Sequence, residues 1–331
     1  MYTVGSLFAG IGGIEKGFEQ AGAKILWASE IDKAACITYR ANFNHTLFEG
    51  DVNSLIADAE AGKIEIPKVD ILTAGFPCQA FSIAGYRKGF EDERGNLFFS
   101  IMKMVRLLRP KALFLENVKN LRTHDHGRTY KIIRDALDDA DYTFTDFVLN
   151  TMEYGNIPQN RERIYMMCFD KNLDSLDQDT HENLESLLLP EKEPLKKKVR
   201  DFLETRVIDD IFYYNQKSPY FDKLNESMTN PNTVYQWRRV YVRENQSNVC
   251  PTLTANMGTG GHNVPLIRDE KGIRKFTPRE CFRLQGFDDS FILPQNLAKS
   301  HLYKQAGNSV SVPVIKILAS KMLRLMEARK I

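Results

Sequence analysis

Residues 75–82 read GFPCQAFS and place Cys78 directly after a buried strand predicted for residues 69–76. Open α/β sheets bind their ligands at the carboxyl ends of such strands. As a thiolate, a cysteine at that position is a soft and strong nucleophile. Taken alone, a free cysteine near a strand end is more often a small buried hydrophobic side chain. The case for catalysis therefore depends on the residues that accompany Cys78.

An acid and two arginines lie at or near the ends of other predicted strands. Glu116 follows the strand predicted for residues 112–115, and Arg161 and Arg163 occupy alternate positions of an extended segment, so they face one way. A thiol, an acid and an arginine pair suit attack on an electron-poor ring whose nitrogen must be protonated. Taken singly, Glu116 or the arginine pair is more typical of a structural ion pair.

A glycine turn and a second acid indicate a nucleotide-like cofactor. Residues 8–13 read FAGIGG and lie where a predicted strand opens a helix, so bare backbone lets a cofactor approach closely. Glu30 ends the next strand, where an acid can accept both ribose hydroxyls. Asp51 could serve the adenine edge, although alone it is typical of an ordinary turn. Because the glycines do not follow GxGxxG, a glycine turn beside a solvated Glu30 is the alternative.

Hydrophobic runs alternate with helical spacing through the first half of the chain. This alternation favours an α/β fold with a mostly parallel sheet flanked by helices. From about Asn172 the pattern becomes polar and loses its helical period, which indicates a boundary and a smaller irregular or β-rich module. The predicted strands cover residues 3–8, 24–29, 69–76, 112–115, 143–150 and 164–169, and the predicted helices include 34–42, 97–108 and 312–329.

Composition excludes several classes of protein. The chain has 331 residues, 43% hydrophobic and 27% charged, and a net charge of +2, which argues against a disulfide miniprotein, a disordered tail and a strongly basic coat. Its five cysteines form no CxxC pair, which favours a reducing compartment. No metal is expected, because His124 and His126 lack two further ligands. No apolar run reaches the ~18 residues of a membrane span, so a cytoplasmic protein is expected.

The motifs in this order resemble the cytosine-5 DNA methyltransferases of bacterial type II restriction-modification systems. The resemblance covers nearly the whole chain and is carried by FAGxGG, Glu30, Gly-Asp51, GFPCQAFS, Glu-Asn-Val at 116–118, QxRxR at 159–163, RExxRLQGF at 279–287 and Gly-Asn-Ser-Val at 307–310. The alternatives are the tRNA-methylating branch of the same superfamily, a silent DNA-binding relative and, from another class, a dinucleotide oxidoreductase. FPCQ rather than PPCQ favours DNA, and the oxidoreductase gives no role to Cys78 and Glu116 together.

The resemblance implies a Rossmann-like S-adenosylmethionine-dependent methyltransferase domain, residues 1–180 plus 300–331. It also implies a smaller, irregular β-rich target-recognition domain with a hinge, residues 181–299. In the family's reaction Cys78 would add to C6 of a cytosine flipped out of double-stranded DNA, and C5 would then take the methyl group. Glu116 matches the acid that engages N3 and the exocyclic amine, and Arg163 matches the arginine at the O2 side, with Arg161 as the second catalytic arginine.

The resemblance also implies which residues hold the cofactor. S-adenosyl-L-methionine would bind between the glycine turn and a closing segment from the far end of the chain, and S-adenosyl-L-homocysteine would be the product. The matching positions are Phe8, Ile11, Gly13, Glu30, Asp51, Val52, Pro77, Leu97, Asn308, Ser309 and Val310.

DNA contacts are expected from a mobile loop and from the recognition domain. The loop would contribute Gln79, Ser82 and Arg94; the recognition domain would contribute Arg238, Arg239, Arg243, Thr254, Gly258 and Gly260. Arginine reading guanine is the commonest specific contact, and the alternative is that these arginines only hold phosphates. The expected setting is a monomer in the bacterial cytoplasm, associated with the nucleoid and paired genetically with a restriction endonuclease.

Three positions depart from the family pattern. Residues 154–159 read YGNIPQ, one residue longer than the usual YGxPQ, which leaves the placement of Gln159 open. Asp288 stands where a proline usually follows Gly-Phe. Ala84 stands where some relatives carry a polar residue that fills the gap left by the flipped base, so another side chain must do this here.

Overall fold

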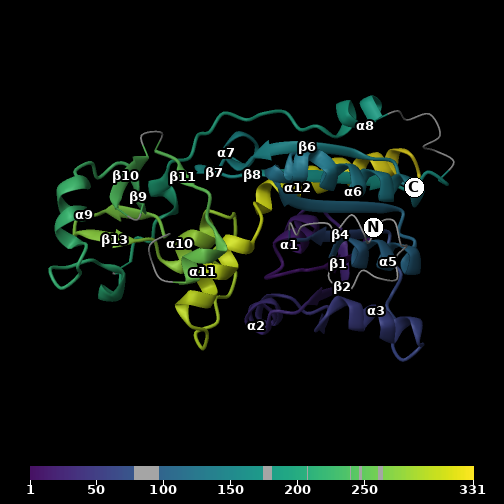
Figure 1. Cartoon of the computed structure of the whole chain (residues 1–331), viewed down its shortest axis with the longest axis horizontal. Helices are drawn as coiled ribbons and strands as arrows, with labels where there is room; N and C mark the ends of the chain where they lie inside the picture. Colours follow the sequence, from purple (N-terminus) through teal and green to yellow (C-terminus); the bar gives the residue numbers. More distant parts are fainter. Residues whose placement is uncertain (78–96, 174–180, 207, 239, 246–247, 260–263) are drawn as a thin grey trace.

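The computed structural model describes residues 1–77, 97–173, 181–206, 208–238, 240–245, 248–259 and 264–331. They form a large lobe around one sheet and a small lobe around another (Figure 1). The large sheet has seven strands in the order β3-β2-β1-β4-β5-β8-β6. The first five strands in this order pair in parallel, and β8 is antiparallel to both of its neighbours, β5 and β6. These strands are β1 (Thr3–Leu7), β2 (Lys24–Glu30), β3 (Thr46–Glu49), β4 (Ile71–Gly75), β5 (Ala112–Val118), β6 (Thr145–Asn150) and β8 (Glu162–Phe169).

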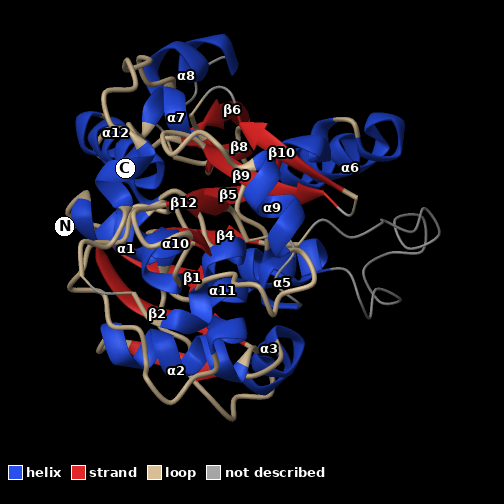
Figure 2. Cartoon of the chain, turned by 90° about the vertical axis from the view of Figure 1, so that its left-hand side faces the viewer, coloured by secondary structure: helices blue, strands red, loops and turns tan. Residues whose placement is uncertain are grey.

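Helices cover both faces of the large sheet (Figure 2). On one face pack α1 (Gly13–Gln20), α8 (His181–Leu188) and α12 (Val312–Ala328), through apolar side chains such as Phe18 and Leu318. On the other face pack α3 (Val52–Glu60), α5 (Leu97–Leu108) and α6 (Arg128–Asp139), through side chains such as Phe98 and Leu137. The central strands read as continuous apolar runs because each is buried on both faces.

The small lobe contains a four-stranded antiparallel sheet in the order β10-β9-β12-β13. Its strands are β9 (Val234–Arg238), β10 (Tyr241–Asn245), β12 (Leu266–Arg268) and β13 (Ile273–Lys275), and α9 (Phe221–Ser227) packs against it. Short 3-10 helices lie at η4 (Val199–Phe202), η5 (Asp210–Phe212) and η6 (Ala255–Thr259), while η2 (Lys119–Arg122) and η3 (His124–Gly127) belong to the large lobe.

Several elements join the lobes. Strand β7 (Gln159–Asn160), which precedes β8, pairs in parallel with β11 (Cys250–Pro251). Helices α10 (Pro278–Arg283) and α11 (Lys299–Asn308) lie between the lobes in Figure 1, and α2 (Lys33–Asn42) shares one apolar cluster with them. The remaining helix is α7 (Thr151–Tyr154). The chain therefore enters the small lobe and returns, so that α12 ends against the large sheet.

The predicted strands and helices correspond closely to observed elements, and the predicted mostly parallel sheet is confirmed. The edge strand β3 and helices α3 and α6 were not predicted. The domain division at residues 180 and 300 stays a prediction; near it, Leu184 and Leu188 of α8 pack with Met322 of α12. Within the described ranges, no helix has the length and apolar character to cross a membrane.

Candidate active site

A cavity of about 390 Å³ opens at the carboxyl ends of β1, β2, β4 and β5. The strand order reverses between β1 and β4, and ligands of open α/β sheets bind at such a switch point. Residues 307–310, between α11 and α12, close the cavity from the far end of the chain. The glycine turn near the start of the chain and residues 307–310 near its end are thus brought to one place.

Most of the predicted cofactor residues line this cavity. They are Phe8, Ile11, Gly13, Glu30, Pro77, Leu97, Asn308, Ser309 and Val310. Asp51 and Val52 are not among the lining residues: the Asp51 carboxylate caps α3 by accepting from the N–H groups of Asn53 and Ser54, and Val52 is buried in the adjoining core. The roles of all these residues in binding remain predictions.

The glycine turn brings bare backbone to the cavity. Gly10 and Gly12 have φ values of 58° and 89°, a region that glycine adopts without strain. Phe8 has a φ of 55° and takes the same left-handed conformation. A Cβ on Gly13 would lie 2.7 Å from Ser309 Oγ and 2.9 Å from Val310 Cγ2. Glycine at position 13 therefore lets the closing segment pack directly on the start of α1.

Glu30 is a structural residue as well as a cavity residue. Its Oε2 accepts from the N–H of Gly10 at 2.7 Å, and its Oε1 accepts from those of Ile31 and Asp32 at 2.8 and 2.7 Å. The carboxylate therefore ties the glycine turn to the start of α2. The two oxygens can together accept about four hydrogen bonds, so acceptor capacity remains on Oε2.

Glu116 and Arg163 form a buried pair in the same cavity. Arg163 Nε lies 3.2 Å from Glu116 Oε1 across the β5–β8 pairing. Burial raises the pKa of Glu116, while the charges of Arg163 and Arg161 act to lower it. Next to it, the Asn117 side chain donates to the carbonyl of Phe76 at 2.8 Å and so fixes the chain one residue before Pro77.

Arg161 lines the cavity, but its guanidinium is occupied by backbone. Nη1 donates to the carbonyl of Leu253 at 2.8 Å, and Nη2 donates to those of Gly307 and Ser309. Burial lowers the pKa of Arg161 to about 9, and the nearby charge of Arg163 adds to this effect, so the side chain still carries its charge at neutral pH. Its catalytic assignment remains a prediction.

Two buried polar atoms of the cavity wall favour a polar ligand. Among the described residues, Arg161 Nε and Ser309 Oγ find no hydrogen-bond partner. Buried polar groups are nearly always hydrogen-bonded, and each unpaired one needs an explanation. Together with the free acceptor capacity of Glu30, these atoms fit a cofactor that carries charged and hydroxyl groups.

Several predicted residues lie outside the described part of the chain. They are Cys78, Gln79, Ala84, Ser82, Arg94, Arg239 and Gly260. The described chain reaches Pro77, the residue before Cys78. Strand β4 ends at Gly75, and Gly75, Phe76 and Pro77 all line the cavity.

The predicted DNA-reading arginines lie on the β9–β10 hairpin. Register places Tyr241 opposite Arg238 and Arg243 opposite Gln236, so these four side chains share one face. Arg238 and Arg243 are exposed, whereas Trp237 on the other face packs against the ring of Tyr220. The face is therefore available to a polar partner.

Thr254 and Gly258, which were predicted to contact DNA, lie in a segment that packs on α11. A Cβ on Gly258 would lie 2.4 Å from the carbonyl oxygen of Ser300, so this glycine is needed for close packing. The Thr254 hydroxyl donates to the Asn256 side chain. A role of either residue in DNA binding is untested.

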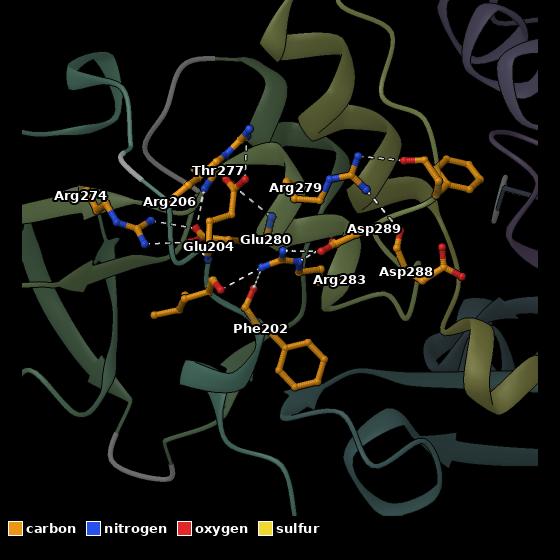
Figure 3. Close-up of polar contacts among 12 residues, drawn as sticks. Phe202, Glu204, Arg206, Arg274, Thr277, Arg279, Glu280, Arg283, Asp288 and Asp289 are labelled. Carbon is orange, nitrogen blue, oxygen red and sulfur yellow. Dashed lines mark hydrogen bonds and ion pairs between the residues drawn. The ribbon is translucent and has the colours of Figure 1, made fainter.

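The motif RExxRLQGF forms a polar network rather than part of the cavity (Figure 3). The fully buried Glu280 binds Arg274 through two hydrogen bonds of 2.8 Å, and Arg274 Nε also binds Asp269 at 2.7 Å. Arg283 donates to the carbonyls of Phe202 and Leu203 and pairs with Asp289. Helix α10 thus fixes the chain that enters the small lobe to the sheet inside it.

Part of the cavity wall was not predicted from the sequence. His301, Lys304 and Gln305 line it from α11, a helix that was not predicted. Lys304 Nζ pairs with Asp32 at 2.7 Å. The question of Gln159 is resolved: the extra Asn156 takes a φ of 48°, and Gln159 Nε2 donates to the carbonyl of Leu284 at 2.7 Å.

Comparison with known proteins decides the family. The model of the C-5 cytosine-specific DNA methylases matches residues 2–324. The chain belongs to this family. The methylase is 50% identical over 330 residues to the Type II methyltransferase M.Bsp6I of Bacillus sp. (strain RFL6), covering 98% of this chain and 100% of that one. It is 38% identical over 326 residues to the Type II methyltransferase M.HhaI of Haemophilus parahaemolyticus, covering 95% and 91%. The predicted DNA cytosine-5 methyltransferase is confirmed.

Solved structures show the same fold. The methylase superposes on S. pombe Dnmt2 methyltransferase with a TM-score of 0.70 at 19% identity, covering 100% of both chains. It superposes on a putative DNA modification methyltransferase of an E. coli prophage with a TM-score of 0.69 at 22% identity, covering 99% and 100%. These likenesses concern the fold alone, and they confirm the predicted fold class.

Proposed function

We propose that this methylase transfers a methyl group from S-adenosylmethionine to C5 of a cytosine flipped out of double-stranded DNA, at one specific site. The observation that carries the proposal is the buried Glu116–Arg163 pair in the cavity that Pro77, the neighbour of Cys78, also lines. An acid, a cation and a strand end that leads to a thiol meet where a pyrimidine could be held.

The proposed chemistry starts with addition of the Cys78 thiolate to C6 of the cytosine. Glu116, with its pKa raised by burial, is suited to give a proton to N3, so that the ring accepts the electron pair of the sulfur. Arg163 stabilises charge at O2. C5 then takes the methyl group, loses its proton to a base, and the thiolate leaves C6. The base that accepts this proton is not assigned.

The cofactor would lie along the glycine turn. Glu30 would accept hydrogen bonds from the ribose hydroxyls, and Ser309 and Arg161 would offer the donors that have no partner among the described residues. S-adenosylmethionine, when bound, supplies an electrophilic methyl group. The chain's own residues bind it, orient it and exclude water. No metal is part of the proposal.

DNA binding is proposed for the small lobe and for residues 79–94, which follow Cys78 in the sequence. A flipped base costs a few kcal/mol, which contacts of the pocket and phosphates must offset. Arg238, Arg239 and Arg243 would read bases or hold phosphates, and Gln79, Ser82 and Arg94 would contact the flipped nucleotide's strand. A short palindromic site of four or five base pairs, rich in G and C, suits a recognition region of this size.

The cellular setting is also proposed. We infer a monomer that acts in the bacterial cytoplasm on nucleoid DNA and protects it from a cognate restriction endonuclease. The supporting observation is the similarity over nearly full length to relatives named Type II methyltransferases.

The test is a covalent trap. The site is first found by bisulfite sequencing of host DNA that expresses the methylase. A duplex with 5-fluorocytosine at that position is then incubated with enzyme and S-adenosylmethionine, since fluorine cannot leave as the C5 proton does. We expect a protein–DNA adduct that peptide mapping places at Cys78 and that Cys78→Ala abolishes. An adduct at another residue, or none while tritium-labelled methyl still enters DNA, overturns the mechanism.

A further inference from the structure

One buried side chain, Arg161, joins three segments that are distant in sequence. Its guanidinium donates to the carbonyls of Leu253, Gly307 and Ser309, at 2.8 Å for the first and 3.3 Å for the second. Only 2% of Arg161 is exposed. Leu253 belongs to the segment 252–259, to which DNA contacts are assigned above, and residues 307–309 form the closing wall of the cavity.

The two segments also touch directly through backbone. A Cβ on Gly307 would lie 2.1 Å from the carbonyl carbon of Thr254 and 2.4 Å from the nitrogen of Ala255. In the first turn of α11, the Ser300 carbonyl meets Gly258 in the same way. Contacts this close leave no room for independent movement, so a shift of the segment 252–259 moves the cavity wall.

The strand that carries Arg161 reaches the catalytic acid as well. Gln159, Arg161 and Arg163 alternate along it and project to one side. Gln159 Oε1 accepts from the N–H of Leu253 at 3.1 Å, and Arg163 Nε lies 3.2 Å from Glu116 Oε1. A single extended stretch therefore touches the DNA side, the cofactor side and the acid.

Arginine is the side chain that suits this connection between three backbone carbonyls. It presents five donors in a rigid planar fork, enough for three separate carbonyls, whereas the lysine ammonium group has three donors on a single nitrogen. Among the described residues no carboxylate pairs with Arg161, so its bonds serve to hold backbone rather than to neutralise an acid. An apolar replacement would leave three buried carbonyls unpaired.

We propose that Arg161, besides the cofactor contact assigned above to its Nε, is through Nη1 and Nη2 a positioning residue that couples DNA binding by the segment 252–259 to cofactor binding in the cavity. The inference rests on the proposed function, because it requires both ligands. Coupling of this kind is reciprocal: whatever factor DNA adds to cofactor affinity, the cofactor adds to DNA affinity.

The test measures the dissociation constant of S-adenosylhomocysteine by calorimetry, with and without a saturating duplex that carries the methylation site. In the wild type we expect DNA to tighten cofactor binding about tenfold, within the usual range of such couplings. In Arg161→Met we expect the ratio of the dissociation constant without DNA to that with DNA to fall to about one. We also expect a raised KM for the cofactor. Arg109→Met is the matched control, since Arg109 also makes three hydrogen bonds, to Asp170 and the Ala140 carbonyl, but not at the cavity. It should keep the wild-type ratio.

A second variant disturbs the contact between residues 307–309 and the segment 252–259 without changing Arg161. Gly307→Ala presses a methyl group against the Thr254 backbone, and we expect it to lower the ratio too, even where Arg161→Met fails to fold. General destabilisation weakens binding equally with and without DNA and leaves the ratio unchanged. If the wild type binds neither ligand, the proposed function fails. If it binds both, a wild-type ratio of one, or an unchanged ratio in the folded variants, overturns the coupling.

Discussion

Glu116 and Glu15 are both buried acids, but their surroundings differ. Glu116 has Arg163 beside it, which opposes the effect of burial on its pKa. Glu15, in the first turn of α1, is fully buried, and neither of its oxygens finds a hydrogen-bond partner among the described residues. Burial raises the pKa of Glu15 to about 7, and the nearby charges of Glu30 and Glu19 add to the rise. The first acid is suited to catalysis, and the second bears on stability.

Replacing Glu116 by Gln keeps the shape of the side chain and removes the proton. We expect kcat to fall by about 10²- to 10⁴-fold, the usual contribution of a general acid. The affinity for S-adenosylhomocysteine, measured by calorimetry, should change less than about twofold, because the role proposed for Glu116 lies in catalysis and not in cofactor binding. A variant with full kcat would remove the assignment. In the wild type, kcat should decline as pH rises through the raised pKa of Glu116, and the residual rate of the variant should lack this limb.

Glu15→Gln tests the buried acid of α1. A raised pKa in the folded state means that its stabilising contribution is complete below the unfolded value of about 4.5 and is lost as pH rises to about 7. The shift is worth at most about 3 kcal/mol. We therefore expect the variant to match the wild type near pH 4.5 and to be more stable by up to ~3 kcal/mol at pH 8. Urea unfolding at several pH values measures this, and parallel curves for the two proteins would contradict it.

At the scale of elements, α1 is packed by glycine at two consecutive turns. Gly13 meets Ser309 and Val310 at the cavity, and Gly17 meets Ile315 of α12, where an added Cβ would lie 2.5 Å from Ile315 Cγ2. The same kind of contact therefore serves the cavity at one turn and the hydrophobic core at the next.

The pair Gly13→Ala and Gly17→Ala separates these two uses. Both substitutions overpack a close contact, and we expect each to lower the free energy of unfolding by about 1 to 3 kcal/mol. Gly13→Ala alone should also weaken S-adenosylhomocysteine binding, about tenfold or more, because it displaces a wall of the cavity. Calorimetry on both variants decides this, and equal affinities would mean that the closing segment does not bind the cofactor.

Elements with a strong hydrophobic pattern could be predicted from the sequence, and those without one could not. The buried runs of β1, β2, β4 and β5 are unambiguous, and so are the acids Glu30 of β2 and Glu116 of β5. Strand β3, by contrast, is a four-residue edge strand with no buried residue. The contacts of Arg161 could not be foreseen, because every residue has a backbone carbonyl. The residue types therefore do not indicate which carbonyls accept a hydrogen bond. Asp51 was assigned to the adenine, but it caps α3. An aspartate can fill either role, so the residue type alone does not distinguish a helix cap from an adenine contact.

The molecule as a whole contains two tryptophans, one in each lobe. Trp27 is fully buried in β2 of the large sheet, and Trp237 lies on β9 of the small sheet. Between them the Glu280–Arg274 pair holds α10 to the small sheet. Variants with a single tryptophan therefore report on the two lobes separately.

Glu280→Ala should uncouple the lobes. Removing one partner of a buried ion pair costs about 3 to 5 kcal/mol, since the other charge stays buried. In Trp27→Phe and Trp237→Phe backgrounds with Glu280 intact, we expect coincident unfolding transitions. With Glu280→Ala added, the signal of Trp237 should change at lower denaturant than that of Trp27. Transitions that stay coincident would show that α10 does not hold the lobes together through this pair.

The wall formed by residues 307–310 has a consequence for biosynthesis. These residues leave the ribosome after the entire small lobe, although the glycine turn they close against is among the first parts made. A nascent chain, or a product truncated before α11, has the turn but lacks its cover. The cavity is therefore complete only in a chain whose synthesis has passed residue 310.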